Sequence, residues 1–233
     1  MTKKTHKRIF VRLWKTILKI FCFILLFTLS QVIALKFINP LFTPNVAWEW
    51  AESIYTKNPD KRPVYLWKDI SLISPHLRKA VLAGEDQRFA LHSGFDLNEI
   101  KQALKTLIHQ KKLRGASTIS MQTARSVFLL SSRSLARKAA EFYYTILIEL
   151  IWDKQRILEI YLNTVDWGTN VTGAEAASQK YFSTSARDLT AAQAALMTAV
   201  LPNPHKWSVQ NPSAFVKKRQ MQIMDVLKKM PLI

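Results

Sequence analysis

The sequence predicts a mainly α-helical protein with one apolar segment near its N-terminus. Helix start signals recur along the chain, strand-like alternation of polar and apolar residues is almost absent, and residues 20–35 carry no charge. A length of 233 residues suits one domain with a short appendage. We therefore expect one compact helical domain, residues 68–233, behind a membrane segment.

The N-terminal part predicts a membrane anchor. Residues 1–19 form a basic tail with seven Lys or Arg residues, and residues 20–36 form the apolar segment. Its uncharged core of 16 residues is shorter than the roughly 20 that a spanning helix needs, but Lys15, Lys19 and Lys36 can extend their ammonium groups toward water. Retention of the basic end in the cytoplasm would leave the rest of the chain outside. A cleaved signal peptide is the alternative, although no small-x-small cleavage pattern follows the apolar run.

Composition limits the partners. The chain has 34 Lys and Arg against 16 Asp and Glu, a net charge of +18, which favours an anionic partner. Charge alone does not choose among nucleic acid, a phospholipid surface and a phosphorylated substrate. Cys22 is the only cysteine and lies in the apolar segment, so neither an internal disulfide nor a cysteine metal site is expected.

Residues 37–67 predict a connector, since they are rich in proline and aromatic residues. Such a connector either lies near the membrane interface, where tryptophan and tyrosine gather, or packs on the domain. A similar choice applies to the apolar residues 127–130, which suit either a lobe that dips into the membrane or a buried helix face.

Several helix starts are predicted by capping patterns. Ser74-Pro75 and Asn211-Pro212 open helices, and Ser134 and Asp153 are N-cap candidates. Three pairs fit the capping box, in which a residue three positions after the cap bonds back to it: Asp96 with Glu99, Thr172 with Glu175, and Thr190 with Gln193.

Two clusters of polar residues could carry chemistry. The first, residues 84–94, places Glu85 and Asp86 at the end of an apolar helix, where acids can line a cleft, although such a pair is more often a solvated helix end. The second, residues 114–122, joins a small-residue turn to a helix start whose free N–H groups could bind an anion. Several basic residues surround that start and would suit a diphosphate or form an ordinary solvated face: Arg114, Arg125, Arg133, Arg137 and Lys138.

Together and in this order, the clusters resemble the motifs of the peptidoglycan glycosyltransferase family, most closely its single-domain biosynthetic transglycosylases. The resemblance covers roughly residues 60–230. The first motif, Glu-Asp-x-x-Phe-x-x-His-x-Gly, is met by Glu85, Asp86, Phe89, His92 and Gly94. The second and third are met by Gly115, Ser117, Thr118, Ile119 and Gln122, and by Arg137, Lys138 and Glu141. The fourth, Ile-Leu-Glu-x-Tyr-Leu-Asn, is met by residues 157–163.

The resemblance implies a lysozyme-like, mainly α fold with a smaller membrane-proximal lobe. It also implies that the enzyme polymerises lipid II into glycan strands and releases undecaprenyl diphosphate, on the periplasmic side of the bacterial inner membrane. Glu85 would be the general base, and Glu141 would bind a divalent cation, Mg²⁺ or Mn²⁺, or orient the basic residues. The remaining substrate-binding residues would be Asp86, Phe89, His92, Arg114, Ser117, Thr118, Gln122, Arg125, Arg133, Arg137 and Lys138.

The chain departs from the family pattern at a few positions. Met121 stands where a glutamine is usual, Arg125 where lysine is common, and Ser126 where asparagine often follows. Asn170 replaces a glycine and Gln193 a glutamate. The residue types alone also favour His92 as a hydrogen-bonded structural residue, because no histidine has zinc-ligand spacing.

Two other functions compete with glycan synthesis. A lysozyme-like lytic glycosidase would use Glu85 as a general acid, but it gains little from several arginines near the cleft. A catalytically silent membrane scaffold would need neither Glu85 nor Glu141. A nucleic-acid partner is not expected, because the chain shows no recognised nucleic-acid module. With no transpeptidase domain in the sequence, we expect cross-linking transpeptidases as possible partners.

Overall fold

The computed structural model describes residues 3–111, 115–132 and 134–233. The chain divides into two compact units, residues 1–38 and 39–233. The first unit is helix α1 (Lys3–Phe37), which contains the stretch Phe10–Phe37 of 28 residues, long and apolar enough to cross a membrane. The apolar helix therefore begins earlier than the predicted segment 20–36 and includes Lys15 and Lys19.

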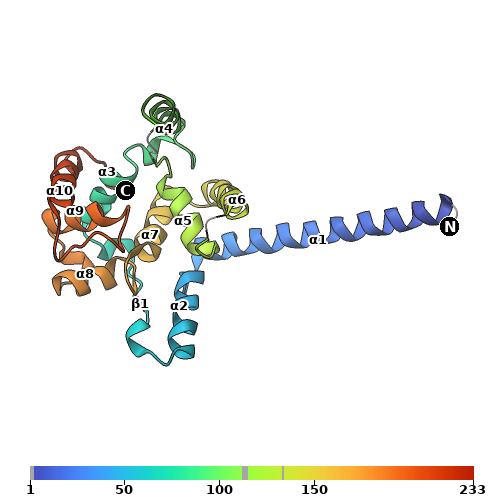
Figure 1. The fold of residues 1–233 in the computed structure, drawn as a ribbon, viewed down its shortest axis with the longest axis horizontal. Helices are drawn as coiled ribbons and strands as arrows, with labels where there is room; N and C mark the ends of the chain where they lie inside the picture. Colours follow the sequence, from blue (N-terminus) through green and yellow to red (C-terminus); the bar gives the residue numbers. More distant parts are fainter. Residues whose placement is uncertain (1–2, 112–114, 133) are drawn as a thin grey trace. The chain divides into compact units, whose positions relative to one another are not determined.

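The second unit is built almost entirely from helices, which confirms the predicted mainly α class (Figure 1). Its α-helices are joined by short 3-10 turns and a small sheet of β1 (Val64–Tyr65), β2 (Asp166–Gly168) and β3 (Val171–Thr172). The strand order is β1-β3-β2, with β1 parallel and β2 antiparallel to β3. The α-helices are α2 (Pro44–Tyr55), α3 (Pro75–Glu85), α4 (Leu97–Gln110), α5 (Ile119–Phe128), α6 (Leu135–Ile151), α7 (Lys154–Thr164), α8 (Ala174–Phe182), α9 (Ala191–Val200) and α10 (Ala214–Leu227).

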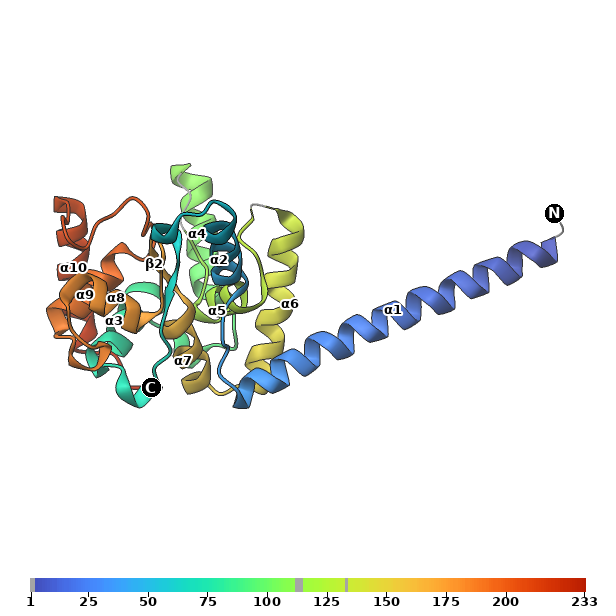
Figure 2. The same ribbon diagram turned by 90° about the horizontal axis from the view of Figure 1, so that it is seen from below.

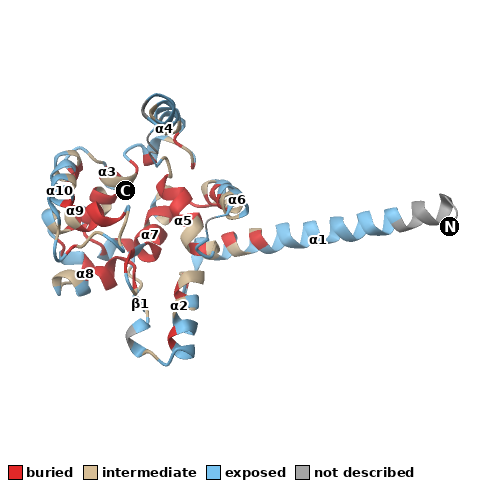
Figure 3. Cartoon of the chain, viewed as in Figure 1, coloured by how far each residue is buried: buried red, intermediate tan, exposed pale blue. Residues whose placement is uncertain are grey.

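Two groups of helices form the core (Figures 1 and 2). In one group α3 and α10 pack against α9, and in the other α5 packs against α6 and α7. Figure 3 shows the buried residues concentrated in α5, α7 and α9, while α4 is largely exposed. Tyr161 and Trp167 are the largest fully buried side chains, and α9 contributes small residues that permit close helix packing. Burial of these apolar faces supplies most of the stabilisation of such helices.

The predicted helix starts agree with the structure at most positions. Ser74, Asp96, Ser134 and Asp153 each cap a helix or its first turn through a side-chain oxygen, and Thr190 with Gln193 forms the complete capping box. Two predictions were wrong by one or two residues. Thr172 lies in β3 while Gly173 occupies the N-cap of α8, and Ser213, not Asn211, caps α10.

The two segments with open choices both make contacts within the second unit, and their proximity to the membrane stays a prediction. Helix α2 lies inside the predicted connector and packs against α5, and Asn45 Oδ1 accepts a hydrogen bond from the Ser131 amide at 2.9 Å. Trp48 and Trp50 nevertheless remain exposed. In the segment 127–130, Val127 is buried and the Phe128 ring stacks on Tyr144, so most of it is a packed helix end.

The turn between β2 and β3 contains Asn170, at a position where the resemblance predicts glycine. This residue has a φ of +60°, a left-handed conformation that asparagine adopts more readily than most residues other than glycine. The replacement of glycine at this position is therefore structurally mild.

Gly173 joins β3 to α8 in a conformation that we expect to be specific to glycine. Its φ is +89°, and a Cβ there would lie 2.7 Å from the carbonyl oxygen of Asn163 at the end of α7. We predict that Gly173→Ala lowers the free energy of unfolding by about 1–3 kcal/mol or more. Gly115→Ala is the matched control, because a Cβ at Gly115 meets no atom within 4 Å. Thermal melts in detergent that show equal stability for the two variants would contradict this prediction.

Candidate active site

A cleft of about 280 Å³ lies where the end of α3, the start of α4 and the segment leading into α5 meet. Its lining is largely polar and includes residues of both predicted clusters. The lining residues are Ala83, Gly84, Glu85, Asp86, Gln87, Arg88, Asp96, Glu99, Gly115, Ala116, Ser117 and Thr118. The structure thus brings together two motifs that are separated by about thirty residues of sequence.

Glu85 is the last residue of α3 and presents a largely buried carboxylate to the cleft. Its side chain is only 12% exposed. Gln122 Nε2 of α5 donates to Oε2 at 3.1 Å, and Arg219 Nη2 of α10 donates to Oε1 at 3.2 Å. Each carboxylate oxygen therefore has one protein donor and retains acceptor capacity for a substrate hydroxyl.

Burial raises the pKa of Glu85 above its ordinary value, because it disfavours the charged form. The hydrogen bond from Gln122 and the positive charges of Arg219 and Arg125 act in the opposite direction. A largely buried carboxyl group with a raised pKa in a polar cleft is a candidate for proton transfer.

Gln122 lies next to Tyr161, a member of the fourth motif on α7. The Tyr161 hydroxyl lies 3.5 Å from Gln122 Oε1, and the ring is fully buried. Burial raises the pKa of Tyr161 well above its ordinary value, so the hydroxyl stays protonated and donates to the amide oxygen. This long contact is compatible with the amide orientation in which Gln122 Nε2 donates to Glu85 at 3.1 Å.

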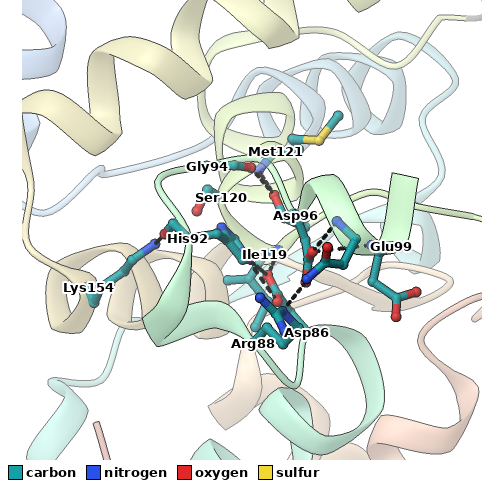
Figure 4. A network of polar contacts seen from close by, with 12 residues as sticks. Asp86, Arg88, His92, Gly94, Asp96, Glu99, Ile119, Ser120, Met121 and Lys154 are labelled. Carbon is teal, nitrogen blue, oxygen red and sulfur yellow. Dashed lines mark hydrogen bonds and ion pairs between the residues drawn. The ribbon is translucent and has the colours of Figure 1, made fainter. Parts of the chain in front are cut away.

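Asp86 connects the first motif to the start of α5. Its Oδ2 accepts a hydrogen bond from the Ile119 amide at 3.0 Å, and His92 Nε2 lies 3.0 and 3.1 Å from its two oxygens. Figure 4 shows these contacts meeting at the Asp86 carboxylate. A negative charge at a helix N-terminus is favourable, so Asp86 holds α5 and its Gln122 in register with Glu85. His92 is hydrogen-bonded within the protein, as its residue type indicated.

Thr118 has a similar positioning role. It caps α5 by accepting from the Met121 amide at 3.2 Å and donates to the Gly94 carbonyl at 2.6 Å. Arg88 Nε lies 3.1 Å from Asp96 Oδ2, which ties the same loop to the start of α4 (Figure 4). Ser117 is half-buried and lines the cleft directly.

Phe89 is buried, with its ring 1% exposed and Lys154 Nζ 4.4 Å from the ring centroid, and it is not among the residues that line the cleft. This burial suits a supporting role in the first motif, and its contact with substrate stays a prediction. Lys154 also donates to the His92 carbonyl at 2.6 Å and to Glu149 at 2.8 Å, and Glu149 accepts from Ser120 of α5. This buried network joins α5, α6 and α7 under the first motif.

Glu141 lies apart from the residues that line the cleft. It is fully buried in α6, and its two oxygens accept from Arg137 and Lys138 on the preceding turn. Arg125 lies on α5, one turn after Gln122, and is half-buried. The predicted residues Arg114 and Arg133 lie outside the described residues. Met121 is 4% exposed, so the family's polar amide is replaced here by a buried, packing side chain.

Each oxygen of Glu141 accepts from one cationic side chain and keeps acceptor capacity, so a divalent cation bound there would lie beside two positive charges. Within residues 3–111, 115–132 and 134–233, no group of three or more His, Cys, Asp or Glu residues could hold a metal ion. The two ion pairs are compatible with the predicted role of Glu141 in orienting the basic residues, and both predicted roles of Glu141 stay predictions.

A buried carboxylate with a raised pKa in a polar cleft is suited to proton transfer, and the comparisons with known proteins indicate the reaction. The family model described as transglycosylase matches residues 52–230. A biosynthetic peptidoglycan transglycosylase of Shewanella oneidensis is 43% identical over 96% of this chain and 93% of its own length. Those of Aeromonas hydrophila and Bacteroides thetaiotaomicron are 44% and 42% identical, over 85% and 88% of this chain and 83% and 82% of theirs.

The chain therefore belongs to the transglycosylase family, and it is a glycosyltransferase with the family's lysozyme-like fold. The family resemblance inferred from the motifs is confirmed. The fold and the two motifs that form the cleft were predictable, because motif order and helix caps are local in sequence. Arg219 was missed, because no sequence pattern links a lone arginine near the C-terminus to Glu85.

The Glu141 pairs predict a stability effect. In Glu141→Gln one buried acceptor is lost and a donor is left facing Arg137 or Lys138, which costs about 1–3 kcal/mol of folding free energy. Glu52→Gln is the control, since its ion pair with Lys61 at 2.8 Å is solvent-exposed and contributes at most about 1 kcal/mol. Chemical denaturation in detergent measures both variants. If Glu141→Gln is as stable as Glu52→Gln, the buried ion pairs make no net contribution to the free energy of unfolding, which contradicts the prediction.

Proposed function

We propose that this chain is a membrane-anchored peptidoglycan glycosyltransferase that polymerises lipid II into glycan strands. The observation that carries this proposal is the Glu85 carboxylate, largely buried in the cleft with a raised pKa and oriented by donors from α5 and α10. Relatives that are similar over most of their length and are named biosynthetic peptidoglycan transglycosylases support it. The basic residues of α5 and α6 suit a diphosphate-bearing substrate.

Glu85 acts as the general base. One carboxylate oxygen takes the proton of an acceptor sugar hydroxyl while the hydroxyl oxygen forms a bond to the anomeric carbon of the donor. The bond between that carbon and the diphosphate oxygen breaks, and the lipid diphosphate leaves with the bonding electrons. A raised pKa makes Glu85 a stronger base than a fully hydrated glutamate, because the protonated product is less disfavoured in the largely buried site.

Cationic residues stabilise the diphosphate as negative charge grows on it. Arg125 retains a positive charge on α5 close enough to influence the pKa of Glu85. Arg137 and Lys138 are held by Glu141 on one face of α6, with Lys138 40% exposed and so able to reach a ligand. Arg114 and Arg133 remain predicted contributors. Binding of Mg²⁺ or Mn²⁺ at Glu141 stays a prediction from the family resemblance.

The proposal is tested by polymerisation of labelled lipid II by the full-length protein in detergent. We expect Glu85→Gln to reduce the rate at least about 100-fold, because the amide cannot accept the proton. Glu52→Gln removes an exposed carboxylate of the same type and should retain the wild-type rate.

The product separates the competing functions. Muramidase-sensitive polymer from the wild type, and none from Glu85→Gln, would support synthesis. Breakdown of preformed glycan without use of lipid II would indicate a lytic glycosidase. Neither activity in the folded wild type would indicate a silent scaffold.

We also propose that α1 anchors the chain in the inner membrane with the second unit on the periplasmic side. The basic residues before Phe10 and the apolar stretch Phe10–Phe37 support this orientation. Association with cross-linking transpeptidases stays a prediction, and membrane cross-linking followed by identification of the captured proteins would test it.

Orientation can be measured with single cysteines in a Cys22→Ser background, since Cys22 is the only native cysteine. Lys217→Cys, on the exposed face of α10, should react with a membrane-impermeant maleimide in cells whose outer membrane alone is permeabilised. Thr5→Cys should react only after lysis of the inner membrane. The reverse labelling pattern would overturn the orientation, and absence of Thr5→Cys from the mature protein would reveal cleavage.

A further inference from the structure

The C-terminal helix α10 reaches the catalytic end of α3. α10 packs against both α3 and α9, and two of its residues one turn apart, Arg219 and Ile223, contact the end of α3 that carries Glu85. Residues near positions i and i+4 share one helix face, so these two side chains act on the same site.

Gly84 is the point that allows this close approach. A Cβ at Gly84 would lie 2.6 Å from Thr198 Cγ2 of α9 and 3.2 Å from Ile223 Cδ1 of α10. The absence of a side chain therefore lets α9 and α10 pack directly on the last turn of α3. That packing brings Arg219 of α10 within hydrogen-bond distance of the Glu85 carboxylate.

Arg219 makes two contacts with this turn through one nitrogen. Its Nη2 donates to the Gly84 carbonyl at 3.0 Å and to Glu85 Oε1 at 3.2 Å. The side chain is 28% exposed and the Glu85 side chain 12%, so the ion pair is shielded from water on most sides. An arginine that binds both the backbone and the carboxylate of one turn restricts the rotamer of that carboxylate.

We propose that Arg219 is the positioning residue for Glu85, and that its guanidinium holds the carboxylate ionised and turned toward the acceptor side of the cleft. The inference deepens the proposed function and rests on Glu85 being the base. Arg219 need not touch the substrate. Its effect is transmitted through Glu85.

Other groups around Glu85 leave a distinct role for Arg219. Arg125 faces it from α5 as a second positive charge without a hydrogen bond to its carboxylate, and Gln122 on the same helix is a neutral donor. Tyr161 from α7 stays protonated, and Asp86 is the next residue in the chain, whose carboxylate is bound by Ile119 and His92. Arg219 is therefore the one cation among the described residues that is both charged and hydrogen-bonded to Glu85.

The sign of the effect follows from the charge. Removal of a nearby cation disfavours the carboxylate, so the pKa of Glu85 should rise further in Arg219→Gln, by about one unit. A base must be deprotonated to act. Activity in the variant should then fall about tenfold at pH values below the pKa and recover as the pH is raised, with KM within about twofold of the wild type.

The first test needs no activity. Full-length protein labelled with ¹³C at the glutamate carboxyl carbon is titrated in micelles, and the Glu85 signal is assigned by its loss in Glu85→Gln. We expect a higher pKa in Arg219→Gln, a nearly wild-type pKa in Arg219→Lys, and no change in Lys218→Gln, an exposed charge on the same helix. Arg219→Met, which keeps the apolar stem, replaces Arg219→Gln if the latter does not fold.

The second test measures kcat and KM for lipid II across pH. A shifted acid limb in Arg219→Gln, restored by Arg219→Lys, supports the inference. An unshifted titration and acid limb in a folded Arg219→Gln or Arg219→Met protein overturns it. If the wild type makes no polymer, the proposed function fails while the titration still decides whether Arg219 governs Glu85.

Discussion

The site depends on one interaction. The buried carboxylate of Glu85 needs hydrogen-bond donors, and these donors come from distant parts of the chain. Glu85 ends α3, and its two oxygens meet Gln122 of α5 and Arg219 of α10. The two groups of helices that form the core therefore meet at this side chain. Burial makes the carboxyl group basic, and the two donors keep it ionised and aimed.

The surrounding motif residues support this interaction. Asp86 and Thr118 secure the N-terminus of α5, and the Tyr161 hydroxyl lies 3.5 Å from the oxygen of the Gln122 amide. Phe89 is buried against Lys154. A motif read from sequence identifies such residues together, but it does not separate those that touch substrate from those that position the residue that does.

Local signals in the sequence were enough to predict the fold class, most helix starts and the residues of the first two motifs. They failed where position depends on tertiary packing. The N-cap of α8 moved to Gly173 because Thr172 was taken by the sheet, and Arg219 gained its contact only because Gly84 lets α10 approach. The role of Glu141 was left between two choices, and its buried pairs with Arg137 and Lys138 leave both as predictions.

The pH dependence of kcat/KM for lipid II polymerisation by the wild-type protein tests the central claim most directly, because this ratio reports the ionisation of the free enzyme. If a largely buried Glu85 is the base, the rate should rise with pH along an acid limb whose midpoint lies above 4.5, the ordinary value for glutamate. The limb should be absent from the residual rate of Glu85→Gln. A limb at or below 4.5, or the same limb in Glu85→Gln, would contradict the claim.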